Sequence, residues 1–302
     1  MKYTEEEQQE YLRRAAEYDK AAADYTKPQA DYAKMETLHS EHLDFMNRVD
    51  VSIVVLTHNY PAVFSRLLDS LRIATQKVPY ELIIVDNGSG RESVDLLKQY
   101  HKQKALTKLI LEPINHFFSE GNNIGVRNSD PSSKYILLLN SDVEILHPLW
   151  LLRILEWMEG IPETYLAHTW STSPTHPTPG PRDIVSVGWS YAEYVPGSAR
   201  PEGWCCMIRR KWWKELSPDF PFYHGFEEMI ADRLHQGAKA GVLFNYSRYL
   251  RHYEGGCEAW KRKHEIVNKR QPDERKWFKG APPVETLDFT LGPNEHRSYM
   301  EW

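Results

Sequence analysis

The sequence predicts an α/β fold in which helices flank both faces of a mainly parallel, Rossmann-like sheet. Between Val51 and Glu144, short apolar runs alternate four times with stretches that carry apolar residues at helical spacing. Each apolar run ends in polar turn formers, as the strands of open α/β sheets do. With 302 residues, 41% of them hydrophobic, the chain can bury a core of this size.

The first fifty residues differ in composition from the rest of the chain. Residues 1–50 are rich in Glu, Lys, Ala, Gln and Tyr, and Pro28 divides them into two expected helices. Tyr11, Ala15 and Tyr18 recur at helical spacing. This face could pack on the main body or join two copies in a homo-oligomer, and the alternative is a solvated appendage.

The main domain is expected to begin at Val51, and its first half spans residues 51–145. We expect strands at residues 51–56, 81–85, 107–111 and 134–140, and helices at residues 64–74, 91–104 and 121–128.

The second half, residues 146–256, is less regular, and residues 257–302 are expected to form a C-terminal helix and tail. We expect a helix at residues 149–159, a loop at 169–181, strands within 184–195 and at 203–210, a helix within 222–237, and strands at 240–246 and 248–252.

Polar residues gather where the strands of the first half end, and parallel strands bring such ends to one crevice. The residues are Thr57, Asn59, Asp86, Asn115, Asn122, Asn140, Ser141 and Asp142. Asp142 is a hard oxygen ligand of the kind that Mg²⁺ or Mn²⁺ accepts, although Asn140 to Asp142 alone also suits an ordinary turn. Gly121–Gly125 at an expected helix start, with Arg127 one turn further, offers a site for an anion.

A competing pattern suggests dinucleotide binding. Gly88 and Gly90 follow a strand and Glu112 ends the next one, which imitates a dinucleotide-binding turn with its ribose-binding acid. The third position of the pattern is Ser93 rather than Gly or Ala, and the turn follows the second strand rather than the first. A nicotinamide-dependent dehydrogenase therefore ranks below the interpretation that follows.

Composition and charge exclude several other classes. The formal net charge of −5 argues against a protein that binds nucleic acid through bulk electrostatics. The three cysteines fit neither a disulfide framework nor zinc spacing. No apolar run approaches the ~20 residues of a membrane span, and the polar N-terminus is unlike a signal peptide. We expect a cytoplasmic protein, with a peripheral position on the inner face of the membrane as the variant.

Four ordered motifs resemble the signatures of family 2 glycosyltransferases with the GT-A fold, including rhamnosyltransferase-like members. They are Ser52–Asn59, Glu81–Ser89, Gly121–Gly125 and Tyr135–Glu144, and the resemblance covers about residues 51–256. It implies that a nucleoside-diphosphate sugar, UDP- or dTDP-linked, binds residues 51–145. The acceptor, a glycan, a lipid-linked sugar or a protein, would bind residues 146–256.

The resemblance also assigns roles to residues of the donor side. Thr57, Asn59 and Asp86 would hold the nucleoside, and Asn140-Ser141-Asp142 would stand for the family's Asp-X-Asp metal motif. Asn140 replaces the first acid, so Asp142 becomes the expected metal ligand, with His252 completing the site. A divalent cation, Mn²⁺ or Mg²⁺, would neutralise the charge that develops on the departing diphosphate.

On the acceptor side, Glu228 resembles the base of the family, and Glu227 is the alternative. One of these carboxylates would remove the proton from the acceptor hydroxyl, although acids in a first helical turn also complement the helix dipole. Trp204 could stack on a sugar ring or pack in the core.

The expected function is therefore a metal-dependent, inverting transfer of a hexosyl or deoxyhexosyl group from a nucleotide sugar to an acceptor hydroxyl, in glycan or polysaccharide biosynthesis. A second hypothesis is a non-catalytic nucleotide-sugar-binding protein, because Asn140 stands where the motif has an acid.

Overall fold

The computed structural model describes residues 51–74, 78–160, 180–188, 200–220, 223–244, 246–253, 279–281 and 284–288. The predicted N-terminal helices, most of the predicted loop at 169–181 and most of the C-terminal tail lie outside this part of the chain.

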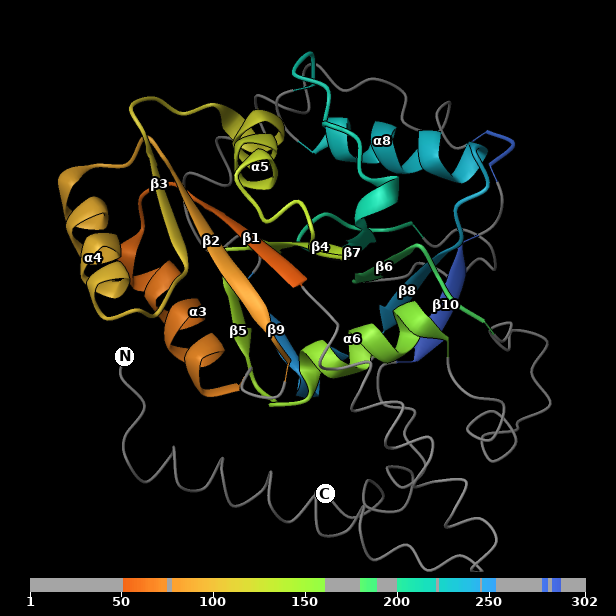
Figure 1. Ribbon diagram of the computed structural model, residues 1–302, viewed down its shortest axis with the longest axis horizontal. Helices are drawn as coiled ribbons and strands as arrows, with labels where there is room; N and C mark the ends of the chain where they lie inside the picture. The colour runs from red at the N-terminus through yellow and green to blue at the C-terminus, as the bar shows by residue number, and fades with distance from the viewer. Residues whose placement is uncertain are drawn as a thin grey trace, which may run out of the picture.

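An eight-stranded sheet forms the centre of the described structure (Figure 1). Its order is β10-β8-β6-β7-β4-β1-β2-β3. The strands are β1 (Val51–Thr57), β2 (Tyr80–Asn87), β3 (Lys108–Glu112), β4 (Tyr135–Asn140), β6 (Ile184–Val187), β7 (Cys205–Arg209), β8 (Ala240–Phe244) and β10 (Glu285–Asp288). β7 runs antiparallel to both of its neighbours, and all other pairs are parallel, which confirms the predicted mainly parallel sheet.

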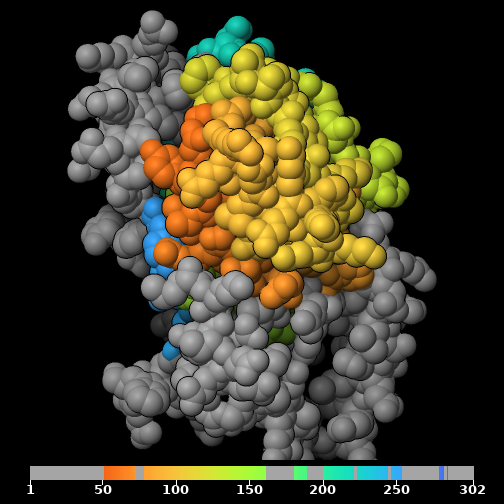
Figure 2. All heavy atoms as spheres, turned by 90° about the vertical axis from the view of Figure 1, so that its left-hand side faces the viewer, coloured from red at the N-terminus to blue at the C-terminus, as the bar shows by residue number. Residues whose placement is uncertain are grey.

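Helices cover both faces of the sheet, as the sequence predicts (Figure 1). α3 (Pro61–Ala74), α4 (Arg91–Lys102) and α6 (Trp150–Glu159) pack with Ile53 and Val55 in one hydrophobic cluster. α5 (Phe117–Arg127) and α8 (His224–His235) pack with Val54 in the other. The period-two alternation along β1 therefore divides its side chains between two cores. Figure 2 shows the α4 side of the molecule, where the gold residues of α4 occupy the middle of the surface. None of the helices in the described ranges has the length and apolarity of a membrane span.

α5 begins four residues earlier than the sequence predicts, which changes the role of its glycines. A Cβ atom on Gly121 would lie 2.5 Å from Leu56 Cδ1, and one on Gly125 would lie 2.3 Å from Val54 Cγ1. These glycines therefore let α5 approach β1 closely. They lie inside the helix, so the predicted anion site at a helix start formed by Gly121–Gly125 is wrong.

Two short strands lie beside the main sheet. β5 (Val143–Ile145) pairs antiparallel with β9 (Leu250–His252), and a short 3₁₀ turn, Tyr246–Arg248, precedes β9. The predicted boundary at residue 256 also needs correction, because β10 returns from the C-terminal tail to pair with β8. The four residues of β10, Glu-Thr-Leu-Asp, carry too little apolar character to be recognised as a strand in advance.

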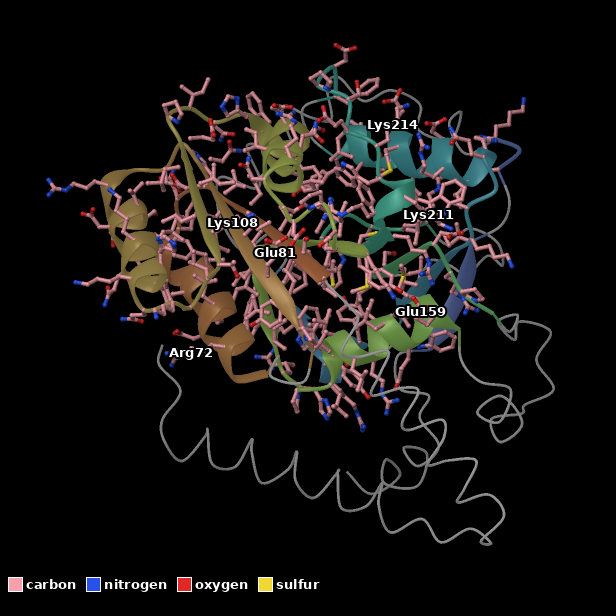
Figure 3. The ribbon with its side chains drawn as sticks, viewed as in Figure 1. Arg72, Glu81, Lys108, Glu159, Lys211 and Lys214 are labelled. Atoms are coloured by element: carbon pink, nitrogen blue, oxygen red, sulfur yellow. The ribbon has the colours of Figure 1, made fainter. Side chains whose placement is uncertain are left out.

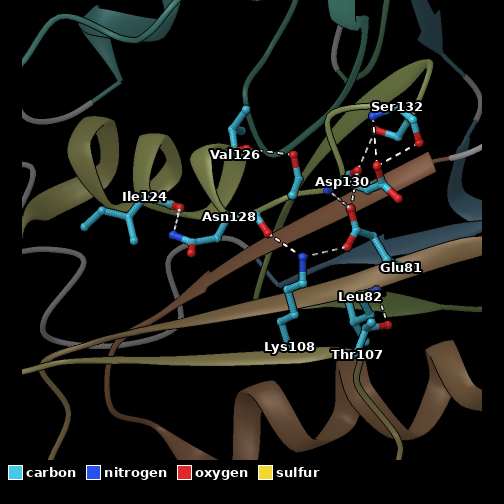
Figure 4. A network of polar contacts seen from close by, with 12 residues as sticks. Glu81, Leu82, Thr107, Lys108, Ile124, Val126, Asn128, Asp130 and Ser132 are labelled. Carbon is cyan, nitrogen blue, oxygen red and sulfur yellow. Dashed lines mark hydrogen bonds and ion pairs between the residues drawn. The ribbon is translucent and has the colours of Figure 1, made fainter.

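A polar network joins the amino-terminal ends of the first strands (Figures 3 and 4). Glu81 Oε1 accepts hydrogen bonds from Ser52 Oγ at 2.6 Å and from the Asp130 N–H at 2.6 Å, and Lys108 Nζ lies 3.5 Å from Glu81 Oε2. Arg210, just beyond β7, donates to Ser52 Oγ at 3.2 Å. Burial lowers the pKa of the Arg210 guanidinium. The network ties both halves of the domain together at the edge opposite the strand ends discussed next.

Candidate functional site

Three predicted site residues meet at the carboxyl edge of the sheet. In the parallel register Thr57 aligns with Asp86, and Leu56 aligns with Asn140. Thr57 and Asp86 are buried, and Asn140 is half-buried. The apolar strands therefore deliver polar side chains to one place, which is where ligands bind in open α/β sheets.

Only one of the two carboxylate oxygens of Asp86 is hydrogen-bonded within the described structure. Its Oδ2 accepts a hydrogen bond from the Ser89 N–H at 3.1 Å. Its Oδ1 is buried and has no hydrogen-bond partner among the described residues. A buried acceptor without a partner is costly, and such groups in proteins commonly meet a ligand or water. Asp86 is therefore suited to accept an N–H or O–H from a bound molecule.

Asn59 connects two loops at this edge. Its backbone N–H donates to Ser89 Oγ at 2.7 Å, and its Oδ1 accepts from the Gly90 N–H at 2.9 Å. The adjacent His58 Nδ1 lies 2.8 Å from the Asn87 carbonyl oxygen. The amide oxygen expected to bind the nucleoside thus holds the loops after β1 and β2 together.

Asn87 is a site residue that the sequence interpretation missed. Its Nδ2 donates to Asn115 Oδ1 at 2.9 Å and to the Phe117 carbonyl at 3.1 Å, and its Oδ1 accepts from the His116 N–H at 2.7 Å. The sequence feature that could have identified Asn87 is its position directly after Asp86 at the end of a strand. Asn87 and Asn115 together shape the loop between β3 and α5.

Asn122 and Arg127 both make contacts with residues of α5. Asn122 is buried, and its Nδ2 donates to the Phe118 carbonyl within α5. Arg127, in the last turn of α5, pairs with Glu215 at 2.7 Å and with Glu120 at 2.8 Å. These hydrogen bonds, the one to Glu215 first, raise the pKa of Arg127.

The direction of α5 explains why the assignment of Arg127 needs correction. Gly121 lies beside Leu56, whereas Gly125 lies beside Val54, so the helix runs back along β1 away from its carboxyl end. Arg127 lies further along the same path and is therefore distant from the crevice.

The dinucleotide-like turn also has a packing explanation. Gly88 has φ +74°, and a Cβ atom there would lie 2.6 Å from the Ile114 carbonyl carbon. Glu112, the supposed ribose-binding acid, lies 3.1 Å from His116 Nε2. Gly88 therefore lets the loops after β2 and β3 pack closely, and Glu112 pairs with a residue of the loop that follows β3.

Asp142 and His252 lie side by side although they are far apart in the sequence. The β5–β9 ladder pairs Val143 with His252, and the Tyr253 N–H donates to the Asp142 carbonyl at 2.9 Å. His252 Nε2 lies 3.3 Å from Asp142 Oδ1. The pairing of these two short strands thus brings a carboxylate and an imidazole face to face, next to Ser141 and Asn140.

The Trp204 ring packs against His252 and is not exposed for stacking on a sugar. It is 5% exposed, and its indole stacks on the His252 imidazole with ring centroids 4.5 Å apart and planes 9° apart. Its Nε1 donates to Glu202 Oε2 at 2.9 Å, and its carbonyl accepts from the Asn140 N–H at 2.7 Å. Of the two expectations for Trp204, packing is the one that the contacts favour.

The Asp142–His252 pair fits a divalent cation by the chemistry of its donors. A carboxylate oxygen and an imidazole nitrogen are both ligands that Mn²⁺ accepts, and the Asp142 side chain is 31% exposed. Within the described ranges no cluster of three or more His, Cys, Asp or Glu residues forms a complete metal site. A cation held here would therefore complete its coordination with substrate oxygens and water, as Mg²⁺ commonly does.

Glu227 and Glu228 lie in the first turns of α8, and α8 begins beside the Trp204 loop. A Cβ atom on Gly203 would lie 3.3 Å from the Phe226 ring, which places the start of α8 next to the strand-end edge. Glu227 Oε2 lies 3.0 Å from His224 Nδ1. Glu228 is half-buried, and its carboxylate makes no hydrogen bond or ion pair within the described chain. Of the two, Glu228 has the carboxylate that remains available.

Comparison with family models gives one match. The model of the family described as glycosyl transferase family 2 matches residues 52–217. The chain is 31% identical over 102 residues to the O-antigen biosynthesis protein RfbC of Myxococcus xanthus. That alignment covers 33% of this chain and 8% of RfbC, so the chain spans a small part of that relative.

The fold is similar to that of the mannosyltransferase PcManGT from Pyrobaculum calidifontis, solved in complex with GDP-Man and Mn²⁺. The TM-score is 0.52 at 14% identity, over 76% of this chain and 67% of that one. This likeness concerns the fold, and it agrees with the expected GT-A fold.

Proposed function

The chain belongs to glycosyl transferase family 2, and on that premise we propose that it transfers a sugar from a nucleoside-diphosphate sugar to an acceptor hydroxyl in a metal-dependent reaction. The observation that carries this proposal is the Asp142–His252 pair, 3.3 Å apart at the carboxyl edge of the sheet.

Asp86 is the proposed contact for the nucleobase. Its buried Oδ1 needs a donor, and a carboxylate can only accept hydrogen bonds when ionised. Uracil, thymine and guanine each carry an N–H on their pairing edge. A UDP- or dTDP-linked sugar, the expected donor, meets this need, and a GDP-linked sugar such as that bound by PcManGT meets it too. Thr57 lies beside Asp86 in the register and completes this part of the site.

Asp142 and His252 are the proposed ligands of the divalent cation, Mn²⁺ or Mg²⁺. The cation, when bound, would neutralise the charge that develops on the diphosphate. Trp204 fixes the plane of the imidazole, so that Nε2 faces the Asp142 carboxylate. Asn140 and Ser141 border the pair and are proposed to hydrogen-bond the donor.

Glu228 is the proposed base of an inverting displacement. The acceptor oxygen forms a bond to the anomeric carbon while the bond from that carbon to the diphosphate oxygen breaks, and the hydroxyl proton passes to the Glu228 carboxylate. A base for this step must lie opposite the leaving group. A helix contributed by the second half of the chain, starting near the strand-end edge, suits that position.

The biological setting proposed for this activity is glycan or polysaccharide biosynthesis. The support is the similarity to RfbC, which is described as an O-antigen biosynthesis protein. A growing glycan, on a lipid or on a protein, is the acceptor class that follows. A hexosyl or deoxyhexosyl group is the sugar class.

A donor-hydrolysis and transfer assay tests the proposal. A panel of UDP-, dTDP- and GDP-sugars is incubated with the protein and Mn²⁺, and the nucleoside diphosphate released is measured. Release that depends on Mn²⁺ and is lost on Asp142→Ala supports the proposal. Binding of a nucleotide sugar without any release, with or without glycan acceptors, favours the non-catalytic alternative that Asn140 suggests.

A further inference from the structure

Two aromatic residues at the carboxyl edge have an unusual backbone conformation. Among the described residues, the non-glycine residues with positive φ are Asn59, Tyr60, Lys104 and Phe117. Asn tolerates this region, and Lys104 follows the end of α4, where left-handed residues are common. Tyr60 and Phe117, with φ of 55° and 60°, are bulky residues for which the left-handed conformation is strained.

The surrounding side chains hold Phe117 in this conformation from both sides. Its N–H donates to Asn115 Oδ1 at 2.7 Å, and its carbonyl accepts from Asn87 Nδ2 at 3.1 Å. The next residue, Phe118, is buried, with its ring 5.1 Å from that of Tyr223. Strain of this kind persists where the neighbours fix the backbone, and it concentrates at ligand sites.

Burial of the Phe117 ring does not explain the strain. Phe117 is 48% exposed and Tyr60 is 46% exposed. The other exposed large apolar residues of the described chain, Leu111 and Ile114, lie on β3 and in the loop that leads to Phe117. All four exposed residues therefore lie at the end of β3, in the loops that follow β1 and β3, or at the start of α5.

The position of both rings relative to Asp86 suggests what they contact. Asn87, which binds the Phe117 carbonyl, directly follows Asp86. Tyr60 lies three residues beyond Thr57, the register partner of Asp86. β1, β2 and β3 are neighbours in the sheet, so Tyr60 and Phe117 follow the strands on either side of β2, the strand that carries Asp86 with its unpaired Oδ1.

We propose that Phe117, together with Tyr60, contacts the face of the nucleobase while Asp86 binds its edge. This inference rests on the proposed function, because it presumes a nucleotide donor. Aromatic rings stack on any base, since every base has a π-face. The strained loop keeps the Phe117 ring at the surface even without ligand, so little ordering is needed when the base binds.

Three variants of Phe117 separate the ring from the strain. Phe117→Ala removes the ring and keeps the left-handed backbone strained, Phe117→Gly removes the ring and relieves the strain, and Phe117→Trp keeps an aromatic ring. The probes are UDP, dTDP and GDP, each with Mn²⁺ and measured by calorimetry, and the tightest binder to the parent protein is used for the variants. Inorganic pyrophosphate with Mn²⁺ is the control ligand, because it has no base.

We expect Phe117→Ala and Phe117→Gly to weaken nucleotide binding by about tenfold each, since stacking on one base contributes roughly that much. Phe117→Trp is expected to stay within about threefold of the parent protein. Pyrophosphate binding should not change in any variant. Phe117→Gly should also unfold at a higher temperature than Phe117→Ala, by roughly 2 °C or more. The difference in unfolding temperature between these two variants measures the backbone strain alone, because both lack the ring.

Unchanged nucleotide affinity in a folded Phe117→Gly protein would overturn the inference, and so would an equal loss of pyrophosphate affinity. In either case the proposed function stands, because the parent protein binds the nucleotide. A parent protein that binds none of the three nucleoside diphosphates would contradict both proposals at once.

Discussion

Asn123 and Leu216 form two hydrogen bonds in the buried interior, and these bonds connect α5 to the segment that leads into α8. Asn123 Nδ2 donates to the Leu216 carbonyl at 2.9 Å, and the Leu216 N–H donates to Asn123 Oδ1 at 2.8 Å. Ser119, one turn earlier on α5, donates to the Phe220 carbonyl at 2.6 Å. The helix that carries Glu228 is therefore fixed to the same helix that packs on β1.

Replacing Asn123 by Ala should destabilise the protein by about 2–4 kcal/mol, because two buried backbone groups of Leu216 lose their partner. Urea unfolding measures this change. Asn128→Ala is the matched control, since the Asn128 amide donates to the Ile124 carbonyl at an exposed site. We expect the control to change stability by less than about 0.5 kcal/mol. Equal effects of the two substitutions would contradict the bridging role of Asn123.

Removal of either proposed metal ligand should abolish the effect of Mn²⁺ on nucleotide binding. Asp142→Ala and His252→Ala each leave one protein ligand for the cation. A single ligand binds Mn²⁺ too weakly to displace its water molecules. The double variant should lose no more affinity than the single ones, because both act through one ion. Calorimetry with and without Mn²⁺ checks this result. Asp95→Asn, at a surface ion pair on α4, is the control and should retain the full Mn²⁺ effect.

Glu228→Gln should lower the transfer rate by about 10²–10⁴-fold while nucleotide affinity stays unchanged, because the amide cannot accept the acceptor proton. Glu227→Gln should have a smaller effect on transfer, since Glu227 already pairs with His224. Single-turnover assays with saturating donor separate the chemical step from binding. If Glu227→Gln lowered the transfer rate more than Glu228→Gln, Glu227 would be the base instead of Glu228.

Alkaline pH should destabilise the fold through Tyr100. Burial and the hydrogen bond from its hydroxyl to Asp69, at 2.9 Å, raise the pKa of Tyr100 above its ordinary value of 10.0. The folded protein thus keeps this proton where the unfolded chain loses it. The contribution of Tyr100 is complete below pH 10 and decreases as the pH rises from 10 towards the raised value in the folded protein. Unfolding curves between pH 8 and 11 should show a smaller decline for Tyr100→Phe than for the parent protein.

The sequence predicted the elements that follow from an apolar pattern. The runs Val51–Thr57 and Tyr135–Asn140 are buried strands with polar ends, and that pattern alone locates Thr57, Asp86 and Asp142 at one edge. The position of His252 beside Asp142 followed from the resemblance to the family. A three-residue strand such as β9 would give too weak a signal to place it.

The errors arose where tertiary contacts decide the role of a residue. The residues that begin α5 include no capping side chain, and Phe117 has a left-handed backbone, so the helix was expected to start later. Arg127 could be placed correctly only when the direction of α5 along β1 was known. Asn87 and Asn123 were missed because an amide does not reveal in advance which backbone groups it will meet.

The stacking of Trp204 on His252 provides an optical reporter within the molecule. Mn²⁺ is paramagnetic, and an ion held by the imidazole would lie close enough to the indole to quench its fluorescence. The difference between the emission of the parent protein and that of Trp204→Phe should therefore decrease as Mn²⁺ is added. Occupancy of the proposed metal site can thus be followed without a label or a substrate.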